Sequence, residues 1–271
     1  MLPRIINGDI DKDMQLFPYV AYISWRFNST MSMLCSGSLI GPSHVLTAAH
    51  CLEEEGSNAL PQNLAVNIRG QWHKVAAAYS HERYNSLNGY LSQPSNDIGL
   101  LALARPVSGP TVRLPKLSGG GLLGGAQAAT SIPAARQKVW VAGYGQTETG
   151  ESSDVLRYTD LTVLTESESE RGFADDFAAG GPSGRTCHGD SGGPVVLPSL
   201  SGDVVVGVTS YGTSSNCTKD YAFYVRTAFH LDWLAAKMAL PIPAPGSLPG
   251  SGAGTKPTLS KPAEEWLNNL P

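Results

Sequence analysis

The chain has 271 residues, of which 41% are hydrophobic and 15% charged, and its formal net charge is −4. Its 30 glycines and 19 prolines exceed the share of about 12% that is usual for these two residues together, which favours a turn-rich all-β protein over a helical bundle. The scattered Lys and Arg residues of an acidic chain exclude nucleic acid as a partner. The lack of an apolar run of about 20 residues excludes a membrane span in this chain.

Short apolar runs rich in β-forming residues recur along the chain, separated by turn signals such as Asn7-Gly8 and Gly41-Pro42. Many short strands without long helices between them are typical of sandwiches and barrels. The runs predict strands at Tyr19–Trp25, Ser38–Ile40, Val45–Thr47, Leu64–Ile68, Ile98–Leu103, Lys138–Ala142, Leu161–Leu164, Pro194–Leu197, Val204–Ser210 and Ala222–Val225.

One long helix is expected near the C-terminal end, at Thr227–Leu240. Residues 241–271 contain seven prolines and four glycines, so we interpret them as a linker or tail. A second low-complexity stretch, Gly119–Ala135, is expected to form a surface loop. The helix is predicted from apolar residues at roughly helical spacing, namely Phe229, Leu231, Trp233, Leu234 and Met238.

The four cysteines, Cys35, Cys51, Cys187 and Cys217, are widely spaced and none belongs to a C-x-x-C pair. A zinc ribbon or a thioredoxin-like site is therefore disfavoured. An even number of cysteines suits two disulfides in an oxidising compartment, and four buried thiols in a cytosolic protein are the alternative. No export signal precedes Arg4, so we expect that such a signal has been removed.

The hexapeptide at residues 189–194, Gly-Asp-Ser-Gly-Gly-Pro, is the most informative motif. A serine flanked by glycines fits a tight turn that exposes its hydroxyl. The backbone N–H groups of Gly189 and Ser191 would then converge on one point as an oxyanion hole. For this motif alone, a simple Gly-rich hairpin is the alternative interpretation.

A serine hydroxyl is a weak nucleophile without a base. His50 lies among small residues in Leu-Thr-Ala-Ala-His-Cys (46–51); alone, it would be interpreted as a histidine packed near a disulfide. A buried carboxylate must orient and stabilise the imidazole. Asp97 is a lone acid at the start of an apolar run, a position where acids usually cap strands, and it fits this role in the company of the other two motifs.

Together these motifs resemble those of the chymotrypsin/trypsin-like serine peptidases. The resemblance covers about residues 5–240, in the order His, Asp, Ser, and includes Gly143-Tyr144-Gly145. It implies an all-β fold of two packed antiparallel six-stranded β-barrels with a C-terminal α-helix. It also implies catalytic roles: His50 as general base, Asp97 as orienting acid and Ser191 as nucleophile.

The resemblance further implies how the chain is processed. Cleavage between Arg4 and Ile5 would activate a zymogen, because the freed amino group would pair with Asp190. Residues 1–4 are then a propeptide remnant, 5–240 the peptidase domain and 241–271 the linker or tail. Cys35–Cys51 and Cys187–Cys217 are the disulfides that the family implies.

The primary substrate pocket follows from the same resemblance. Arg185 is expected at its floor, where trypsin-like members carry an aspartate, and a guanidinium there favours Glu or Asp before the scissile bond. If Arg185 turns to solvent, the pocket is medium-sized and apolar; if Asp220 reaches inward, basic specificity is restored. The remaining pocket residues are expected to be Thr186, Ser210, Tyr211, Gly212 and Ala222, with His188 at the mouth.

We therefore expect a secreted, monomeric serine endopeptidase that acts on protein or peptide substrates and needs a separate activating protease. No cofactor and no metal are expected, since residues 69–78 lack the carboxylates of the trypsin calcium loop. The alternative is a catalytically silent relative that serves as a binding or scaffold protein. An α/β-hydrolase esterase is excluded because its order is Ser, Asp, His and no βαβ pattern surrounds Ser191.

Overall fold

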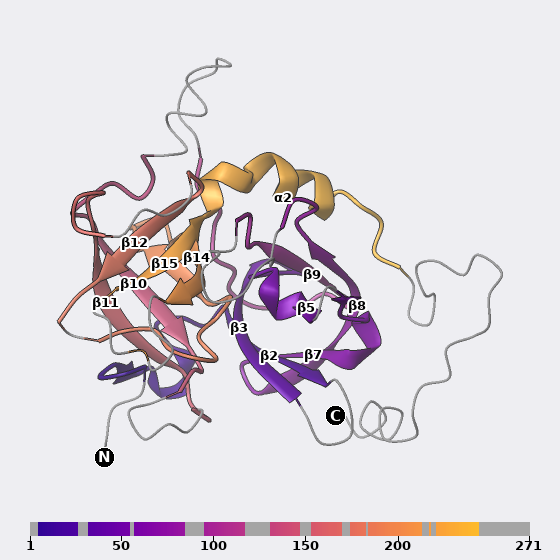
Figure 1. Cartoon of the computed structure of the whole chain (residues 1–271). Helices are drawn as coiled ribbons and strands as arrows, with labels where there is room; N and C mark the ends of the chain where they lie inside the picture. Colours follow the sequence, from indigo (N-terminus) through magenta and orange to yellow (C-terminus); the bar gives the residue numbers. More distant parts are fainter. Residues whose placement is uncertain are drawn as a thin grey trace.

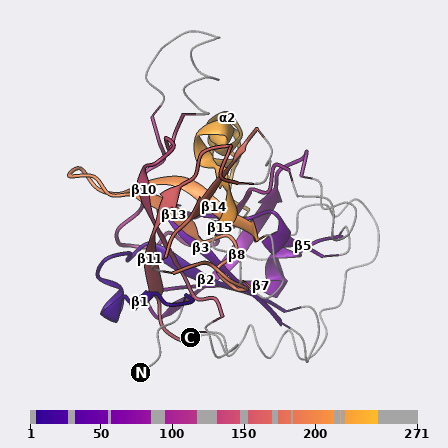
Figure 2. The same cartoon turned by 60° about the vertical axis from the view of Figure 1, so that its left-hand side comes forward.

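Two β-barrels lie side by side in the computed structural model (Figure 1). The structure describes residues 5–26, 32–54, 57–84, 95–116, 131–146, 153–169, 174–182, 184–212, 217 and 221–243. Figure 2 brings the second barrel forward and shows α2 at its upper edge. The predicted fold of two six-stranded antiparallel barrels with a C-terminal helix is confirmed.

The first barrel closes because β7 pairs with β2. Its side chains alternate between the interior and the outer face, as expected for a period of two: along β2, Ala21, Ile23 and Trp25 are buried, whereas Tyr22 and Ser24 are half-buried. The strands, in order around the barrel, are β2 (Val20–Arg26), β3 (Ser32–Gly41), β4 (His44–Thr47), β9 (Gly99–Leu103), β8 (Gln71–Ser80) and β7 (Leu64–Ile68).

The second barrel closes through the pairing of β12 with the end of β11. The short β1 (Asp9–Ile10) pairs with the start of β11. All of its pairings are antiparallel. The strands, in order, are β11 (Arg157–Val163), β10 (Lys138–Gly143), β13 (Pro194–Leu197), β14 (Val204–Gly212), β15 (Tyr221–Arg226) and β12 (Asp176–Gly180).

Small elements connect the strands. The hairpin of β5 (Glu53–Glu54) and β6 (Ser57–Asn58) follows the 3₁₀ turn η2 (His50–Leu52). Two further 3₁₀ turns are η1 (Lys12–Met14) and η3 (Pro61–Asn63).

The C-terminal helix is shorter than the sequence predicted. The expected helix Thr227–Leu240 divides into a 3₁₀ turn, η5 (Thr227–His230), and an α-helix, α2 (Leu231–Met238). Because the first turn is tighter, Phe229 leaves the apolar face and is 44% exposed. Leu234 is fully buried and packs into the core of the first barrel.

Most strands agree with the prediction, and those at Leu64–Ile68 and Pro194–Leu197 agree at both ends. The structure adds β8, β12 and the short β1, β5 and β6. Residues 1–4, most of the expected loop Gly119–Ala135 and residues 244–271 of the tail lie outside the described residues. In the described ranges, no helix is long and apolar enough to cross a membrane.

Two apolar clusters organise the core. The larger one fills the first barrel and reaches the second barrel at Ala142, Tyr144 and Val208. The smaller one fills the second barrel and includes Ile5, which is fully buried. Two disulfides are formed: Cys35–Cys51 joins β3 to η2, and Cys187–Cys217 joins the segment just before Ser191 to the segment between β14 and β15.

Candidate active site

His50 and Asp97 meet at one end of the first barrel because β4 and β9 are antiparallel neighbours. Thr47 at the end of β4 pairs with Gly99 at the start of β9. The residues just beyond this pair, His50 in η2 and Asp97 before β9, therefore leave the sheet at the same place. Gly99 allows the close approach, since a Cβ there would lie 3.1 Å from the carbonyl oxygen of Ala48.

Asp97 is fully buried and its carboxylate is hydrogen-bonded on both oxygens. Oδ1 accepts the backbone N–H of His50 at 2.8 Å, and Oδ2 lies 2.7 Å from Nδ1 of the His50 ring. Ser210 of β14 donates its hydroxyl to Oδ2 at 2.5 Å. Burial alone would raise the pKa of Asp97, but the charge of His50 and these hydrogen bonds hold the pKa below its ordinary value.

The contact with Asp97 also shifts the pKa of the His50 imidazole. Burial lowers its pKa, whereas the negative charge of Asp97 and the hydrogen bond to it raise the pKa by more, so that the pKa lies above 6.5. With Nδ1 facing Asp97, the bound proton on Nδ1 leaves Nε2 as the proton acceptor of the neutral ring. This is the tautomer that a general base for a hydroxyl requires.

The loop that carries Ser191 is fastened to both barrels. Ser36 of β3 donates its N–H to the carbonyl oxygen of Ser191 at 2.8 Å and its hydroxyl to that of Gly189 at 2.9 Å. Gly189 has a φ of +92°, in the region that favours glycine. At Gly192 a Cβ would collide with Thr47 and with the carbonyl of Ser36. Gly189 is therefore required by its backbone conformation, and Gly192 by its close contact with the first barrel.

Asp190, next to Ser191, is the second buried carboxylate of the site. It is 1% exposed, and its oxygens accept the N–H of Gly145 at 2.8 Å and that of Cys187 at 2.9 Å. Burial outweighs these two hydrogen bonds and raises the pKa of Asp190 to about 7. Within the described ranges, its carboxylate has no cationic partner.

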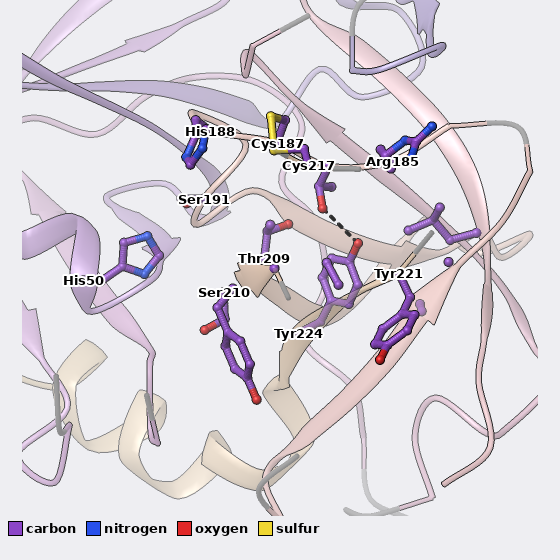
Figure 3. Close-up of a pocket in the computed structure, with 17 residues that line it drawn as sticks. His50, Arg185, Cys187, His188, Ser191, Thr209, Ser210, Cys217, Tyr221 and Tyr224 are labelled. Atoms are coloured by element: carbon purple, nitrogen blue, oxygen red, sulfur yellow. Dashed lines mark hydrogen bonds between the residues drawn. A yellow bond between two sulfur atoms is a disulfide. The ribbon is translucent and has the colours of Figure 1, made fainter. Parts of the chain in front are cut away.

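His50 and Ser191 line one cavity of about 290 Å³, shown in Figure 3. Among the described residues no hydrogen bond joins Nε2 of His50 to the hydroxyl of Ser191; the contact of Nε2 is with Sγ of Cys51 at 3.8 Å. The part of the chain that the structure describes thus contains the contact between His50 and Asp97, but not one between His50 and the Ser191 hydroxyl. Such contacts are often long before substrate binds.

The pocket residues expected from the resemblance all border this cavity, namely Arg185, Thr186, His188, Ser210, Tyr211, Gly212 and Ala222. Arg185, half-buried, lies on the side opposite His50 in Figure 3, and Thr186 is linked to the Tyr224 hydroxyl at 3.1 Å. His188 is exposed, as expected at the mouth. Asp220, invoked as a possible source of basic specificity, lies outside the described residues.

Two details of the site were not visible in the sequence. Ser210 was expected only as a pocket wall, yet its hydroxyl also holds Asp97. Tyr211 stacks on Phe223, with ring centroids 4.8 Å apart, and donates its hydroxyl to Asp176 at 3.0 Å. Both contacts join residues far apart in sequence, so no local motif could have indicated them.

Histidine and cysteine atoms gather at two places, around His50 and around His188. The sulfur atoms there belong to the two disulfides, so they offer no thiolate to a metal ion. The expected lack of a metal stays a prediction.

A model of the trypsin family matches residues 5–234. The chain belongs to the trypsin family of serine peptidases. It is 30% identical to a trypsin of Phaedon cochleariae over 247 residues, covering 85% of this chain and 87% of that protein. It is 27% identical to chymotrypsin-C of Rattus norvegicus over 255 residues (88% and 90%). It is also 27% identical to glucanase inhibitor protein 3 of Phytophthora sojae over 218 residues (74% and 77%).

The trypsin-family geometry predicts the titration of His50. An NMR titration of its ring should give a pKa above 6.5, because Asp97 supplies a negative charge. In Asp97→Asn the charge is lost while burial remains, so the pKa should fall below 6.5. The matched control is Asp160→Asn, which removes a carboxylate bonded to Lys138 on the surface. An unchanged pKa in Asp97→Asn would contradict the assignment of the shift to this pair.

Proposed function

We propose that the protein is a secreted serine endopeptidase, and that residues 5–240 form its catalytic domain. The observation that carries this proposal is the buried Asp97–His50 pair, which borders the same cavity as Ser191. A base oriented by a buried carboxylate next to a serine on a glycine-rich turn is the arrangement needed for nucleophilic catalysis. The two disulfides support an oxidising, extracellular compartment.

The roles of the residues follow from this geometry. The Ser191 hydroxyl attacks the carbonyl carbon of the scissile bond while Nε2 of His50 takes its proton. The imidazolium that forms is stabilised by Asp97 and returns the proton to the leaving amine. Water, deprotonated in turn by His50, then attacks the acyl carbon, the bond from that carbon to Oγ of Ser191 breaks, and His50 returns the proton to Oγ.

The N–H groups of Gly189 and Ser191 are proposed to bind the oxyanion. Their positions are fixed by the carbonyl groups of the same two residues, which accept hydrogen bonds from Ser36. Donors held in place before the reaction stabilise developing charge without reorganisation. The strand segment 210–212 at the end of β14 borders the cavity and offers backbone groups to an extended peptide.

Replacement of the nucleophile tests this mechanism. Ser191→Ala should reduce kcat by about 10⁶, because the reaction loses its covalent step, and should leave the melting temperature unchanged. His50→Ala should cost nearly as much, and the double variant little more, since the two residues act as a unit. With residues 1–4 removed from every chain compared, an active-site titrant should give a burst with the wild-type sequence and none with either variant. More than about a hundredth of wild-type turnover in Ser191→Ala would remove Ser191 from its role.

A catalytically silent binding protein is the second candidate function. It is favoured by the similarity to a protein named a glucanase inhibitor and by the open contact between His50 and Ser191. The burst experiment separates the two functions: an activated chain that binds peptides but releases no titrant product would support the silent protein.

Activation is proposed to occur by cleavage between Arg4 and Ile5. The segment after this bond already contacts the second barrel, because Ile5 is buried and the carbonyl of Ile6 accepts the N–H of Arg185 at 3.1 Å. A free amino group at Ile5, with an ordinary pKa of about 8, would supply the cation that the Asp190 carboxylate lacks. The ion pair would favour the charged form of Asp190 and stabilise the adjacent oxyanion hole.

Removal of residues 1–4 should therefore raise activity strongly. Asp190→Asn in the trimmed chain should abolish the gain, because the amide offers no charge to the new amino group. Turnover of the full and trimmed chains is compared with one chromogenic substrate. Equal activity before and after trimming would show that this cleavage does not activate the protein.

The primary specificity is proposed to be acidic. Arg185 borders the cavity, and its guanidinium matches a carboxylate in shape and charge. Chromogenic peptides that differ only in Glu, Leu or Arg before the scissile bond should be hydrolysed fastest with Glu. Arg185→Gln should remove this preference and favour Leu. Fastest hydrolysis of the Arg peptide would refute the proposal, and a Leu preference in the unmodified chain would support the medium apolar pocket.

A further inference from the structure

A second cavity, of about 530 Å³, lies apart from the catalytic one and shares no lining residue with it. We name it the aromatic groove. Its walls are the segment 10–14, the rings of Tyr22, Trp72 and Tyr144, and the segment 154–156. It is larger than the catalytic cavity, and the peptidase mechanism uses none of its side chains.

The fold places three aromatic rings together in this groove. Tyr22 of β2 and Trp72 of β8 both pair with Asn67 of β7, so their side chains form one row on the outside of the first barrel. The Tyr22 ring stands nearly perpendicular to that of Trp72, with centroids 5.8 Å apart. Tyr144, which follows β10 of the second barrel, packs against Tyr22 at 5.5 Å. The groove therefore lies where the two barrels meet.

Negative charge surrounds these rings. Asp11, Asp13 and Asp154 line the groove, and Lys12 is the one cation among the described residues that line it. The carboxylate of Asp11 is held by the N–H groups of residues 15–17, whereas Asp13 and Asp154 are exposed. The charge of Asp154, after burial, contributes to the raised pKa of Tyr22, which places that carboxylate within electrostatic reach of the rings.

We propose that the aromatic groove binds a Lys- or Arg-bearing segment of another protein. Aromatic faces attract an ammonium or guanidinium group, and the exposed carboxylates add charge complementarity. Ile10 and Val155, 42% and 41% exposed, offer apolar surface to the alkyl stem of the same side chain. An acidic partner would be repelled, and a bare metal ion would gain nothing from the apolar surface.

The groove is connected to the catalytic loop through one serine. The backbone N–H of Tyr144 donates to the Ser36 hydroxyl at 3.1 Å, and this hydroxyl donates to the Gly189 carbonyl at 2.9 Å. Ser36 therefore links Tyr144, in the wall of the groove, to the loop that carries Ser191. The proposal concerns binding and does not depend on the proposed peptidase activity.

Binding of a basic peptide tests the proposal. The full chain carrying Ser191→Ala, which cannot cleave the probe, is titrated with a blocked seven-residue peptide of alternating Gly and Lys while Trp fluorescence is recorded. The emission should change on binding, and Trp72→Phe should remove most of the change while keeping an aromatic ring in place. The same peptide with Gln in place of Lys should not bind.

The charge requirement is tested with matched variants. Asp13→Asn together with Asp154→Asn should weaken binding about fivefold or more. Asn is suited to position 13 because that residue has a φ of +60°. The control pair, Glu166→Gln with Asp232→Asn, removes the same charge from exposed positions that do not line the groove. Equal weakening by both pairs, equal binding of the Gln peptide, or a response independent of Trp72 would overturn the proposal.

Discussion

A fully buried carboxylate, that of Asp97, constrains the whole site. A charge removed from water is tolerated only when its oxygens receive strong hydrogen bonds. Two of the donors come from His50 in the first barrel and the third, Ser210, comes from the second. The burial of this one charge therefore requires that both barrels be present and correctly placed. The orientation of the imidazole is a consequence of the same requirement.

The second buried carboxylate, Asp190, behaves in the opposite way. Interaction with His50 and hydrogen bonds from His50 and Ser210 keep the pKa of Asp97 low, whereas Asp190 accepts two N–H groups among the described residues and its pKa rises to about 7. The difference lies in the partner and not in the burial, because both groups are almost completely removed from solvent. One carboxylate is thus satisfied by the fold, and the other is the partner that we propose for the freed amino group of Ile5.

The parts of the fold that the sequence predicted are those with a local signal. Uninterrupted apolar runs such as Leu64–Ile68 and Pro194–Leu197 became strands with the expected ends. β8 was missed because its N-terminal half, Gln71–Lys74, is polar and incompletely buried. β12 was missed because it is short and begins with an acid. Its buried Asp176 accepts the hydroxyl of Tyr211, which reaches it from β14.

In the candidate site too, the residues that belong to local motifs were predicted, and those defined by long-range contacts were not. Short motifs pointed to His50, Asp97 and Ser191; in the structure His50 and Asp97 are in direct hydrogen bond, and His50 and Ser191 border one cavity. The role of Ser210 toward Asp97 depends on a contact across 113 positions of sequence, and no local pattern carries that information. The aromatic groove was equally invisible, since Tyr22, Trp72 and Tyr144 are brought together only by strand pairing and barrel contact.

The position of α2 has a consequence for synthesis on the ribosome. The strands of the first barrel end at Leu103, yet Leu234, near the end of the domain, packs into that barrel's core. A nascent chain exposes its N-terminal half first. More than a hundred further residues must therefore be synthesised after Leu103 before Leu234 can cover its part of the first barrel's core. Ser210 likewise reaches Asp97 only after the second barrel has emerged. The full set of hydrogen bonds to Asp97 therefore cannot form on a partly made chain.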